Sequence, residues 1–184
     1  PRRGREVCSL PSNPADPVLD AEIPKLHQFY IGEGIIRTIV FVTLRAAVFV
    51  MTVPDLQNFF LKRSKHPVHY VYVFHSMVST HMVYRLGAFD HYDTILCVGP
   101  QHEREIRANE AVYGLRAKRL VAHGYGRLDS IMAQREHEHE ATLSTEGKVR
   151  VLVAPSWGPG GTLEIHGLDL VRHLLSAGYE VVLR

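Results

Sequence analysis

Cysteine and tryptophan are scarce in this chain, whose 184 residues include two cysteines and one tryptophan. Cys8 and Cys97 lie far apart in unlike surroundings, so the sequence offers neither a disulfide framework nor the closely spaced ligands of a zinc site. So little cysteine is typical of a protein in a reducing compartment. No metal site is expected at His137 and His139 either, because an i, i+2 spacing points them to different sides of a helix.

A large excess of one charge is also missing. The chain has 21 Lys and Arg residues against 19 Asp and Glu, which gives a formal net charge of +2. Nucleic-acid-binding proteins concentrate a basic excess on one face, so nucleic acid is not an expected partner. Glycine and proline, at 14 and 10 residues, are at ordinary levels, which excludes collagen-like and low-complexity architectures.

The sequence has no long apolar run that is free of charge. Residues 34–53 are the most apolar stretch and have about the length of a membrane span. Arg37 and Arg45 would both lie in the hydrocarbon, at a high cost, so we do not expect this stretch to cross a membrane. No segment has the charged start, apolar middle and small-residue cleavage site of a signal peptide.

From Ile35 onward, short apolar runs alternate with amphipathic segments, a pattern typical of an α/β fold with a parallel sheet. We expect four strands, at residues 47–52, 69–75, 94–98 and 119–123. Helices are expected at residues 54–60, 79–86, 101–113 and 127–140. Gly114 is expected to end the third helix, because helices commonly end at a glycine in the left-handed conformation.

The chain is expected to hold one Rossmann-like domain and the start of a second. Residues 1–24, with five of the ten prolines, form a Pro-rich leader; residues 25–140 form the first domain and residues 141–148 a linker. Residues 149–184 are expected to form one βαβ unit, which is too small to bury a core of its own. The chain also begins without Met and stops within an apolar run, so we expect a fragment that is truncated within its second domain.

The helix of this βαβ unit has a simple apolar pattern. Its expected buried residues are Leu168, Val171, Leu174 and Leu175. Gly178 is expected to end the helix, and residues 179–183 to form the next strand.

Ligands of parallel α/β sheets bind at the carboxyl ends of the strands, so the residues that follow each strand are candidates for a site. His75 and Ser76 follow the second strand, where an imidazole that exchanges a proton near neutral pH can act as a general base. A half-buried histidine with one hydrogen bond is an equally good interpretation from the residues alone.

Residues 124–129, Gly-Tyr-Gly-Arg-Leu-Asp, follow the fourth strand. Gly124 suits a tight turn, and the forked guanidinium of Arg127 can bind a phosphate. Asp129 stands at the expected start of a helix, where capping that helix is favoured over a catalytic role.

Residues 155–161 form a Gly-rich segment before the last helix. Its backbone N–H groups and the helix N-terminus can hold an anion such as a pyrophosphate, although many such turns bind nothing. Trp157 is a candidate ledge for a ligand, and packing in a core is the alternative.

Four parts of the sequence carry a family resemblance: residues 70–75 (Tyr-Val-Tyr-Val-Phe-His), 87–93, 124–129, and 151–157 with 177–184. Together they resemble the CDP-glycerol glycerophosphotransferase family, which comprises the teichoic-acid primases and polymerases. The resemblance runs from about residue 45 to the end of the chain, and its last two segments are the most specific.

The resemblance implies a GT-B fold, in which two Rossmann-like domains face each other across a cleft. It implies transfer of glycerol phosphate, or a related polyol phosphate, from a CDP-activated donor to a hydroxyl of a lipid-linked acceptor in cell-envelope polymer synthesis. His75 matches the family's first active-site histidine, which takes the proton from that hydroxyl. No cofactor and no essential metal are implied.

The resemblance also assigns two groups of binding residues. The acceptor-side residues are Ser76, Gly124, Tyr125, Arg127 and Asp129. The residues for the donor nucleotide and phosphate are Ser156, Trp157, Gly158, Gly160, Gly161 and Arg184. Arg184 is the one residue here that corresponds to the family's Arg-Pro-His-Pro motif.

A lipid-linked acceptor implies a cytoplasmic protein that is peripheral on the inner face of the cell membrane. The basic and aromatic residues 59–65 are a candidate contact for anionic lipid, and an ordinary amphipathic helix with a cationic end explains them equally well. Two other functions stay open: a GT-B nucleotide-sugar glycosyltransferase or epimerase, and a non-catalytic envelope-assembly protein with the same fold. The fragment alone is expected to be inactive.

Overall fold

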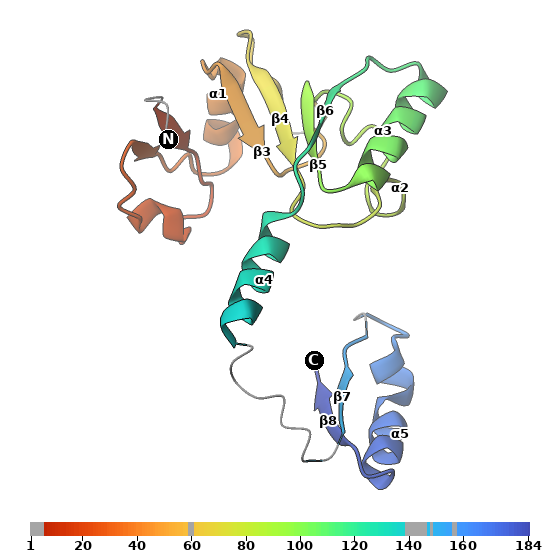
Figure 1. Cartoon of the computed structure of the whole chain (residues 1–184). Coiled ribbons are helices and arrows are strands. Elements are labelled where there is room, and N and C mark those ends of the chain that lie inside the picture. The colour runs from red at the N-terminus through yellow and green to blue at the C-terminus, as the bar shows by residue number, and fades with distance from the viewer. Residues whose placement is uncertain (1–5, 59–60, 139–146, 148, 156–157) are drawn as a thin grey trace. The chain divides into compact units, whose positions relative to one another are not determined.

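The computed structural model describes residues 6–58, 61–138, 147, 149–155 and 158–184. The chain divides into two units, Pro1–Ser130 and Ile131–Arg184, each with its own internal contacts. Figure 1 shows their elements along the chain. The expected linker at residues 141–148 lies outside the described residues except for Gly147.

The first unit is built on a four-stranded parallel sheet (Figure 1). Its strands are β3 (Val48–Met51), β4 (His69–Val73), β5 (Thr94–Cys97) and β6 (Arg119–Ala122). Their order in the sheet is the same as their order in the chain. Each strand lies within the range expected from the sequence, and the expected mixed α/β fold with a parallel sheet is confirmed.

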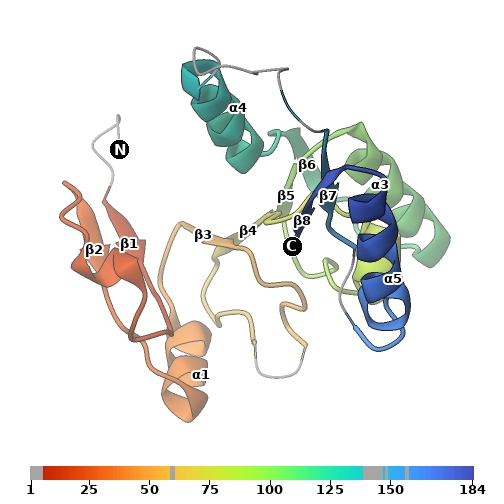
Figure 2. The same cartoon turned by 90° about the horizontal axis from the view of Figure 1, so that it is seen from below.

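The two faces of this sheet differ. Tyr70 and Tyr72 of β4 point to the same face as Ile95 and Cys97 of β5, and each of these four side chains is at most 1% exposed. On the opposite face, Val50 of β3 is 57% exposed. Sequential strand order with right-handed crossovers puts all the connections on one face, and Figure 2 shows α3 on one side of the strands. The core of the first unit therefore lies on one side of its sheet.

Aromatic rings fill this core. The ring of Tyr72 lies 4.9 Å from Phe74, 4.9 Å from Phe89 and 5.2 Å from Tyr92, in edge-to-face arrangements that aromatic pairs favour. Burial raises the pKa of Tyr72 and of Tyr92 above the ordinary tyrosine value, because the ionised form would lose its solvation.

Four helices belong to or begin in the first unit: α1 (Gly34–Thr43), α2 (Thr80–Val83), α3 (Pro100–Tyr113) and α4 (Gly126–Glu138). Pro100 stands in the first turn of α3, where its missing N–H costs nothing. Gly114 ends α3 with φ +61° and donates its N–H to the Glu110 carbonyl, as the sequence predicted. The helix expected at residues 79–86 is shorter, and Ser79 caps it by accepting from the His81 N–H at 3.3 Å.

The prediction of a helix at residues 54–60 is wrong for residues 54–58, which are the part of this range that the structure describes. Residues 54–58 form turns in which Asp55 and Gln57 have φ values of +68° and +71°. The Asp55 N–H donates to the Ala88 carbonyl at 2.8 Å, and Leu56 is 1% exposed in the core. These tertiary contacts replace the local helical bonds that the apolar spacing suggested. Phe59 and Phe60, on which that spacing also relied, lie outside the described residues.

Four elements near the N-terminus were not predicted from the sequence: β1 (Val7–Ser9), η1 (Pro17–Asp20), β2 (Leu26–Gln28) and the helix α1. The leader contains β1 and the 3₁₀ turn η1, and β1 pairs in parallel with β2. Helix α1 lies within the most apolar stretch and was not predicted, although Ile35, Ile36, Ile39 and Val40 recur at the i, i+1, i+4, i+5 spacing of a helix. No helix among the described residues is long and apolar enough to cross a membrane.

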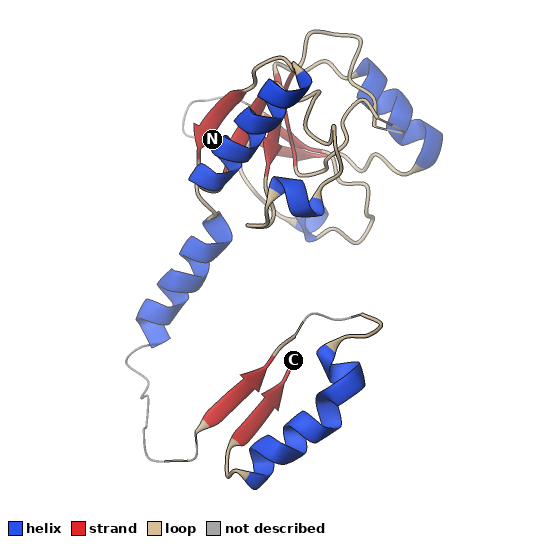
Figure 3. Ribbon diagram, turned by 90° about the vertical axis from the view of Figure 1, so that its right-hand side faces the viewer, coloured by secondary structure: helices blue, strands red, loops and turns tan. Residues whose placement is uncertain are grey.

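The second unit contains the expected βαβ arrangement (Figure 3). Its elements are β7 (Arg150–Val153), α5 (Thr162–Ser176) and β8 (Glu180–Leu183), and the two strands pair in parallel. Gly178 follows α5 with φ +86°, and the Tyr179 N–H donates to the Leu174 carbonyl at 3.1 Å, which confirms the expected helix end.

The expected buried face of α5 is partly wrong. Val171 and Leu174 are half-buried, whereas Leu168 and Leu175 are 74% and 55% exposed. Leu170 is half-buried instead. The half-buried apolar side chains of α5 are therefore Leu170, Val171 and Leu174, at i, i+1 and i+4. Two strands are too narrow to cover the wider stripe that the apolar residues of this helix offer.

Candidate functional site

The carboxyl edge of the four-stranded sheet carries two of the segments that the sequence singled out. Strand β4 ends at Val73, just before His75 and Ser76, and β6 ends at Ala122, just before residues 124–129. Because all four strands are parallel, both segments lie at the same edge, where ligands of such sheets bind.

One hydrogen bond joins these two segments. The Tyr125 hydroxyl donates to the backbone carbonyl of His75 at 2.9 Å. The His75 side chain is exposed, whereas Ser76 and Tyr125 are half-buried. The structure therefore brings together His75, Ser76 and Tyr125 in the first unit, and it leaves the imidazole of His75 accessible to a substrate.

The turn after β6 is held by backbone bonds. The N–H groups of His123 and Gly124 both donate to the Cys97 carbonyl, at 2.9 and 3.2 Å, and Gly124 has φ +80°. Helix α4 begins at Gly126, with the Leu128 N–H bonded to the Tyr125 carbonyl at 2.8 Å. The glycine at position 124 is thus required by the turn itself.

Arg127 and Asp129 are exposed residues of the first turn of α4. The expectation that Asp129 caps this helix is wrong, because the helix begins three residues earlier. A carboxylate in the first turn still interacts favourably with the helix dipole. Both side chains are therefore accessible at the same sheet edge as His75.

His102, which the sequence reasoning did not single out, supports the loop that follows His75. It is completely buried, and its ring lies 4.0 Å from Phe74. Its Nε2 lies 2.9 Å from the Val78 carbonyl, and its Nδ1 accepts from the Val98 N–H at 3.4 Å. Its burial could have been predicted from spacing, since His102, Ile106 and Glu110 recur every four residues along the buried side of α3.

Glu105 of α3 fixes the start of α2 to the same helix. Its Oε2 accepts from both the N–H and the hydroxyl of Thr80, each at 2.6 Å. Burial by itself would raise the pKa of Glu105, but these hydrogen bonds to the carboxylate outweigh it and lower the pKa below the ordinary value. The loop between β4 and α2, which begins at His75, is thus held at both of its ends.

The Gly-rich loop of the second unit leads into α5, and Gly161 is the residue before the helix. Gly158 and Gly160 have φ values of +132° and +80°. The Gly160 N–H donates to Glu164 Oε2 at 2.9 Å, so a carboxylate of the chain itself occupies one donor that was expected to face a phosphate.

The other donor-side residues are placed as follows. Arg184 is exposed, and its N–H donates to the Val153 carbonyl at 3.1 Å, beyond the end of β8. Ser156 and Trp157 lie outside the described residues. The acceptor-side residues belong to the first unit and the donor-side residues to the second.

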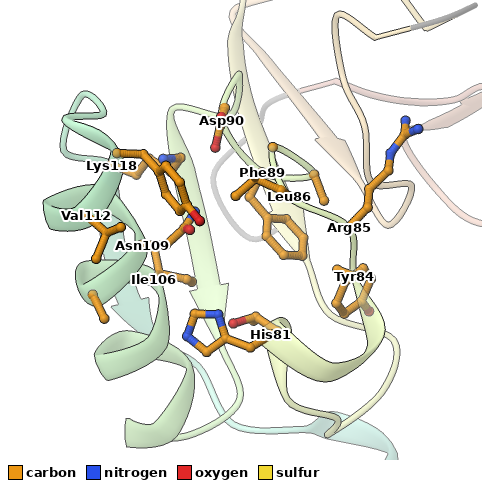
Figure 4. Close-up of a pocket in the computed structure, with 15 residues that line it drawn as sticks. His81, Tyr84, Arg85, Leu86, Phe89, Asp90, Ile106, Asn109, Val112 and Lys118 are labelled. Carbon is orange, nitrogen blue, oxygen red and sulfur yellow. The ribbon is translucent and has the colours of Figure 1, made fainter.

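A pocket of about 460 Å³ lies in the first unit between α3 and the segment from Thr80 to Asp90 (Figure 4). It is lined by both apolar and charged side chains. None of the predicted catalytic or binding residues lines it, although residues 87–90 of its wall belong to a segment that carries the family resemblance. The pocket itself was not predicted, because its walls come from segments whose contact depends on the tertiary fold.

No group of three or more His, Cys, Asp or Glu residues that could hold a metal ion exists within the part of the chain that the structure describes. A scan against protein-family models, a search of curated proteins and a search of solved structures each found no match to this chain.

Proposed function

We propose that this chain forms part of a glycerophosphotransferase-like enzyme with a GT-B fold. In this proposal the enzyme transfers glycerol phosphate, or a related polyol phosphate, from a CDP-activated donor to a lipid-linked acceptor. The observation that carries the proposal is the hydrogen bond from Tyr125 to the His75 carbonyl, because it unites the two motifs of the acceptor side at one sheet edge. The resemblance of those motifs to the family supplies the reaction.

His75 would act as the general base. The acceptor hydroxyl oxygen attacks the phosphorus that bears the glycerol, His75 takes the hydroxyl proton, and the bond from that phosphorus to the CMP oxygen breaks with its electron pair on CMP. Such transfers depend on positioning and charge stabilisation more than on covalent catalysis. A histidine on a loop that is anchored by His102 and Tyr125 meets the positioning requirement.

Arg127 is the candidate cation for the negative charge of the substrates on the acceptor side. It is exposed at the start of α4, next to the Tyr125 turn. On the donor side, Arg184 and the glycines from 158 to 161 would bind the nucleotide and its phosphates. Glu164 would first have to release the Gly160 N–H, because a carboxylate repels a phosphate.

The lipid-linked acceptor places the proposed enzyme at the inner face of the cell membrane as a peripheral protein. Lys62 and Lys65 are exposed, and cations of this kind attract anionic headgroups. Vesicles with and without anionic lipid test this contact, and equal binding to both would contradict it.

The test of the reaction uses the full-length gene product with CDP-glycerol and a lipid-linked acceptor, and it measures CMP release. We expect His75→Ala to lower the rate by about 10²- to 10⁴-fold, the usual contribution of a general base. His123→Ala tests the other histidine at this edge, and His91→Ala is the control, because His91 lies before β5 at the opposite end of the sheet. Unchanged turnover in His75→Ala would refute the role of His75.

A non-catalytic binding module is the second candidate, and the bond between Glu164 and Gly160 favours it. In that case neither CDP-glycerol nor a nucleotide sugar would raise the melting temperature, since a ligand that binds only the folded state stabilises it. A rise with a nucleotide sugar but not with CDP-glycerol would instead favour a glycosyltransferase or epimerase.

A further inference from the structure

The pocket beside α3 is separate from the sheet edge that carries His75, and its walls suggest a ligand of a particular kind. Its volume of about 460 Å³ is in the range of sites for small molecules. In Figure 4, side chains of α3 form one wall and residues 84–90 form the other, with His81 at one end and Asp90 and Lys118 at the opposite end.

The middle of the pocket is apolar. Ile106 and Phe89 are 4% and 8% exposed and form its inner surface. Leu86 and Val112 stand on opposite walls and are 64% and 73% exposed. A ligand with an apolar group between these walls would remove both side chains from water, which stabilises the complex in proportion to the area buried.

Lys118 brings a buried positive charge to one end. It is 4% exposed, and its Nζ lies 3.4 Å from Glu110 Oε1. Glu110 also accepts from the Lys118 N–H and from Arg107, so two cations share one carboxylate. An ammonium group has three N–H donors. A buried charge is costly when its donors have no hydrogen-bond acceptors. Among the described residues the ammonium group of Lys118 has one acceptor, Glu110, so Lys118 has donors to spare for an anionic group in the pocket.

Asp90 brings a negative charge to the same end. It is half-buried, and its carboxylate makes neither an ion pair nor a side-chain hydrogen bond within the described part of the chain. Arg85, on the same wall, extends away from the pocket in Figure 4 and pairs with Asp55 at 2.6 Å. Asn109 of α3 points into the pocket between the two ends and adds an amide that can donate and accept.

We propose that this pocket binds a zwitterionic small molecule of the α-amino acid class with a large apolar side chain. The ligand carboxylate accepts from Lys118, its ammonium group donates to Asp90, and its side chain lies between Leu86 and Val112 over Phe89. A ligand without the ammonium group would leave Asp90 without a partner, and one without the carboxylate would leave the spare donors of Lys118 unused. This inference does not depend on the role of His75, because none of its residues belongs to that sheet edge.

The experiment measures binding to the 184-residue chain by isothermal titration calorimetry with L-phenylalanine, L-leucine and L-methionine as probes. Two analogues of phenylalanine each lack one charge: 3-phenylpropanoate has no ammonium group and 2-phenylethylamine has no carboxylate. We expect at least one amino acid to bind with a Kd below about 10 mM, and each analogue to bind about tenfold more weakly than phenylalanine, the usual effect of losing one charged hydrogen bond. Failure of all three amino acids to bind, or equal affinity for the analogues, would overturn the proposal.

Two substitutions test the charge of Asp90 and the location of the ligand. Asp90→Asn is expected to weaken phenylalanine and 2-phenylethylamine by about tenfold and to leave 3-phenylpropanoate unchanged. Ala108→Phe, at an exposed position of the pocket lining, is expected to block all three ligands by filling the pocket. Asp169→Asn, in the exposed pair with Arg172 of α5, is the matched control and should leave every affinity unchanged. Normal binding in Ala108→Phe, or in Asp90→Asn, would place the ligand elsewhere and refute the site.

Discussion

Asp93 joins β4, β5 and the segment before β4, so its removal should weaken the first unit more than removal of any exposed charge. Its Oδ2 accepts from the Tyr70 N–H at 2.8 Å and from Arg63 at 3.0 Å, and its Oδ1 accepts from Arg116 at 3.1 Å. The Asp93 side chain is 11% exposed, and Tyr70 is 1% exposed. The guanidinium of Arg63 also lies 4.4 Å from the centre of the Tyr70 ring.

The magnitude follows from these three contacts. In Asp93→Ala the buried Tyr70 N–H loses its partner, which costs about 1–3 kcal/mol. Arg63 is 30% exposed, so loss of its pair costs only about 1 kcal/mol after solvent screening. Arg116 is 80% exposed and contributes little. We therefore expect Asp93→Ala to lower the free energy of unfolding of the first unit by about 2–4 kcal/mol, and Arg116→Ala to lower it by less than about 0.5 kcal/mol.

The assay has to report on the first unit alone. Fluorescence of Trp157, the one tryptophan, would report on the second unit. Hydrogen exchange followed by mass spectrometry on peptides from β4 and β5 measures local opening of the sheet instead. Equal protection in the Asp93→Ala and Arg116→Ala variants would refute the argument that the buried N–H of Tyr70 dominates.

The same contacts predict a pH dependence. Burial alone would raise the pKa of Asp93, but the Tyr70 N–H and Arg63 outweigh it and lower the pKa below the ordinary value of 3.8. A carboxylate whose pKa is lower in the folded state stabilises the protein above the unfolded value and loses this effect as the pH falls through the folded value. Protection of β4 should thus fall below about pH 3.8 in the native chain and fall less in Asp93→Asn. An equal loss of β4 protection at acid pH in Asp93→Asn and in the native chain would contradict this.

Three further predictions concern other parts of the first unit. A thiol reagent should label Cys8, which is exposed, and should label Cys97 only after unfolding, because Cys97 is buried and burial raises its pKa to about 11; labelling of both thiols in the native chain would contradict this. Met51→Ala should cost about 2–5 kcal/mol in denaturant unfolding and Val50→Ala less than about 1 kcal/mol, because Met51 is 8% and Val50 is 57% exposed, and equal losses would contradict a one-sided core. Gly114→Ala should cost about 1 kcal/mol through its φ of +61°, which a melting curve measures; no loss would contradict the left-handed helix end.

The strands could be predicted from the sequence because each is a short run of β-branched and aromatic residues, and burial of one face of each run needs no knowledge of the rest of the chain. The turns at residues 54–58 could not. Their apolar spacing suits a helix, but the Asp55 N–H finds its acceptor at Ala88, more than thirty positions away in the chain. The positive φ of Asp55 accompanies that distant bond, which the local sequence does not reveal.

In the candidate site, too, some features follow from the local sequence and others depend on distant contacts. His75, Ser76 and residues 124–129 were predicted from their places after strands, a rule that depends only on the parallel sheet. The bond that joins them, from the Tyr125 hydroxyl, and the support from His102 depend on tertiary packing. Likewise, the bond from the Gly160 N–H to Glu164 could not be read from the glycines alone, because it depends on the side-chain conformation of a helical glutamate.

The way in which His75 is held allows its chemistry to be separated from its structural role. Tyr125 binds the backbone carbonyl of His75, and the imidazole itself is exposed. Replacing the imidazole in His75→Ala therefore leaves this bond in place, whereas Tyr125→Phe removes the bond and keeps the imidazole. If His75 is a base, His75→Ala should lower turnover by about 10²- to 10⁴-fold without a change in melting temperature. Tyr125→Phe should lower turnover less, while it loosens the loop. A loss of stability in His75→Ala equal to that in Tyr125→Phe would show that the histidine serves the fold and not the reaction.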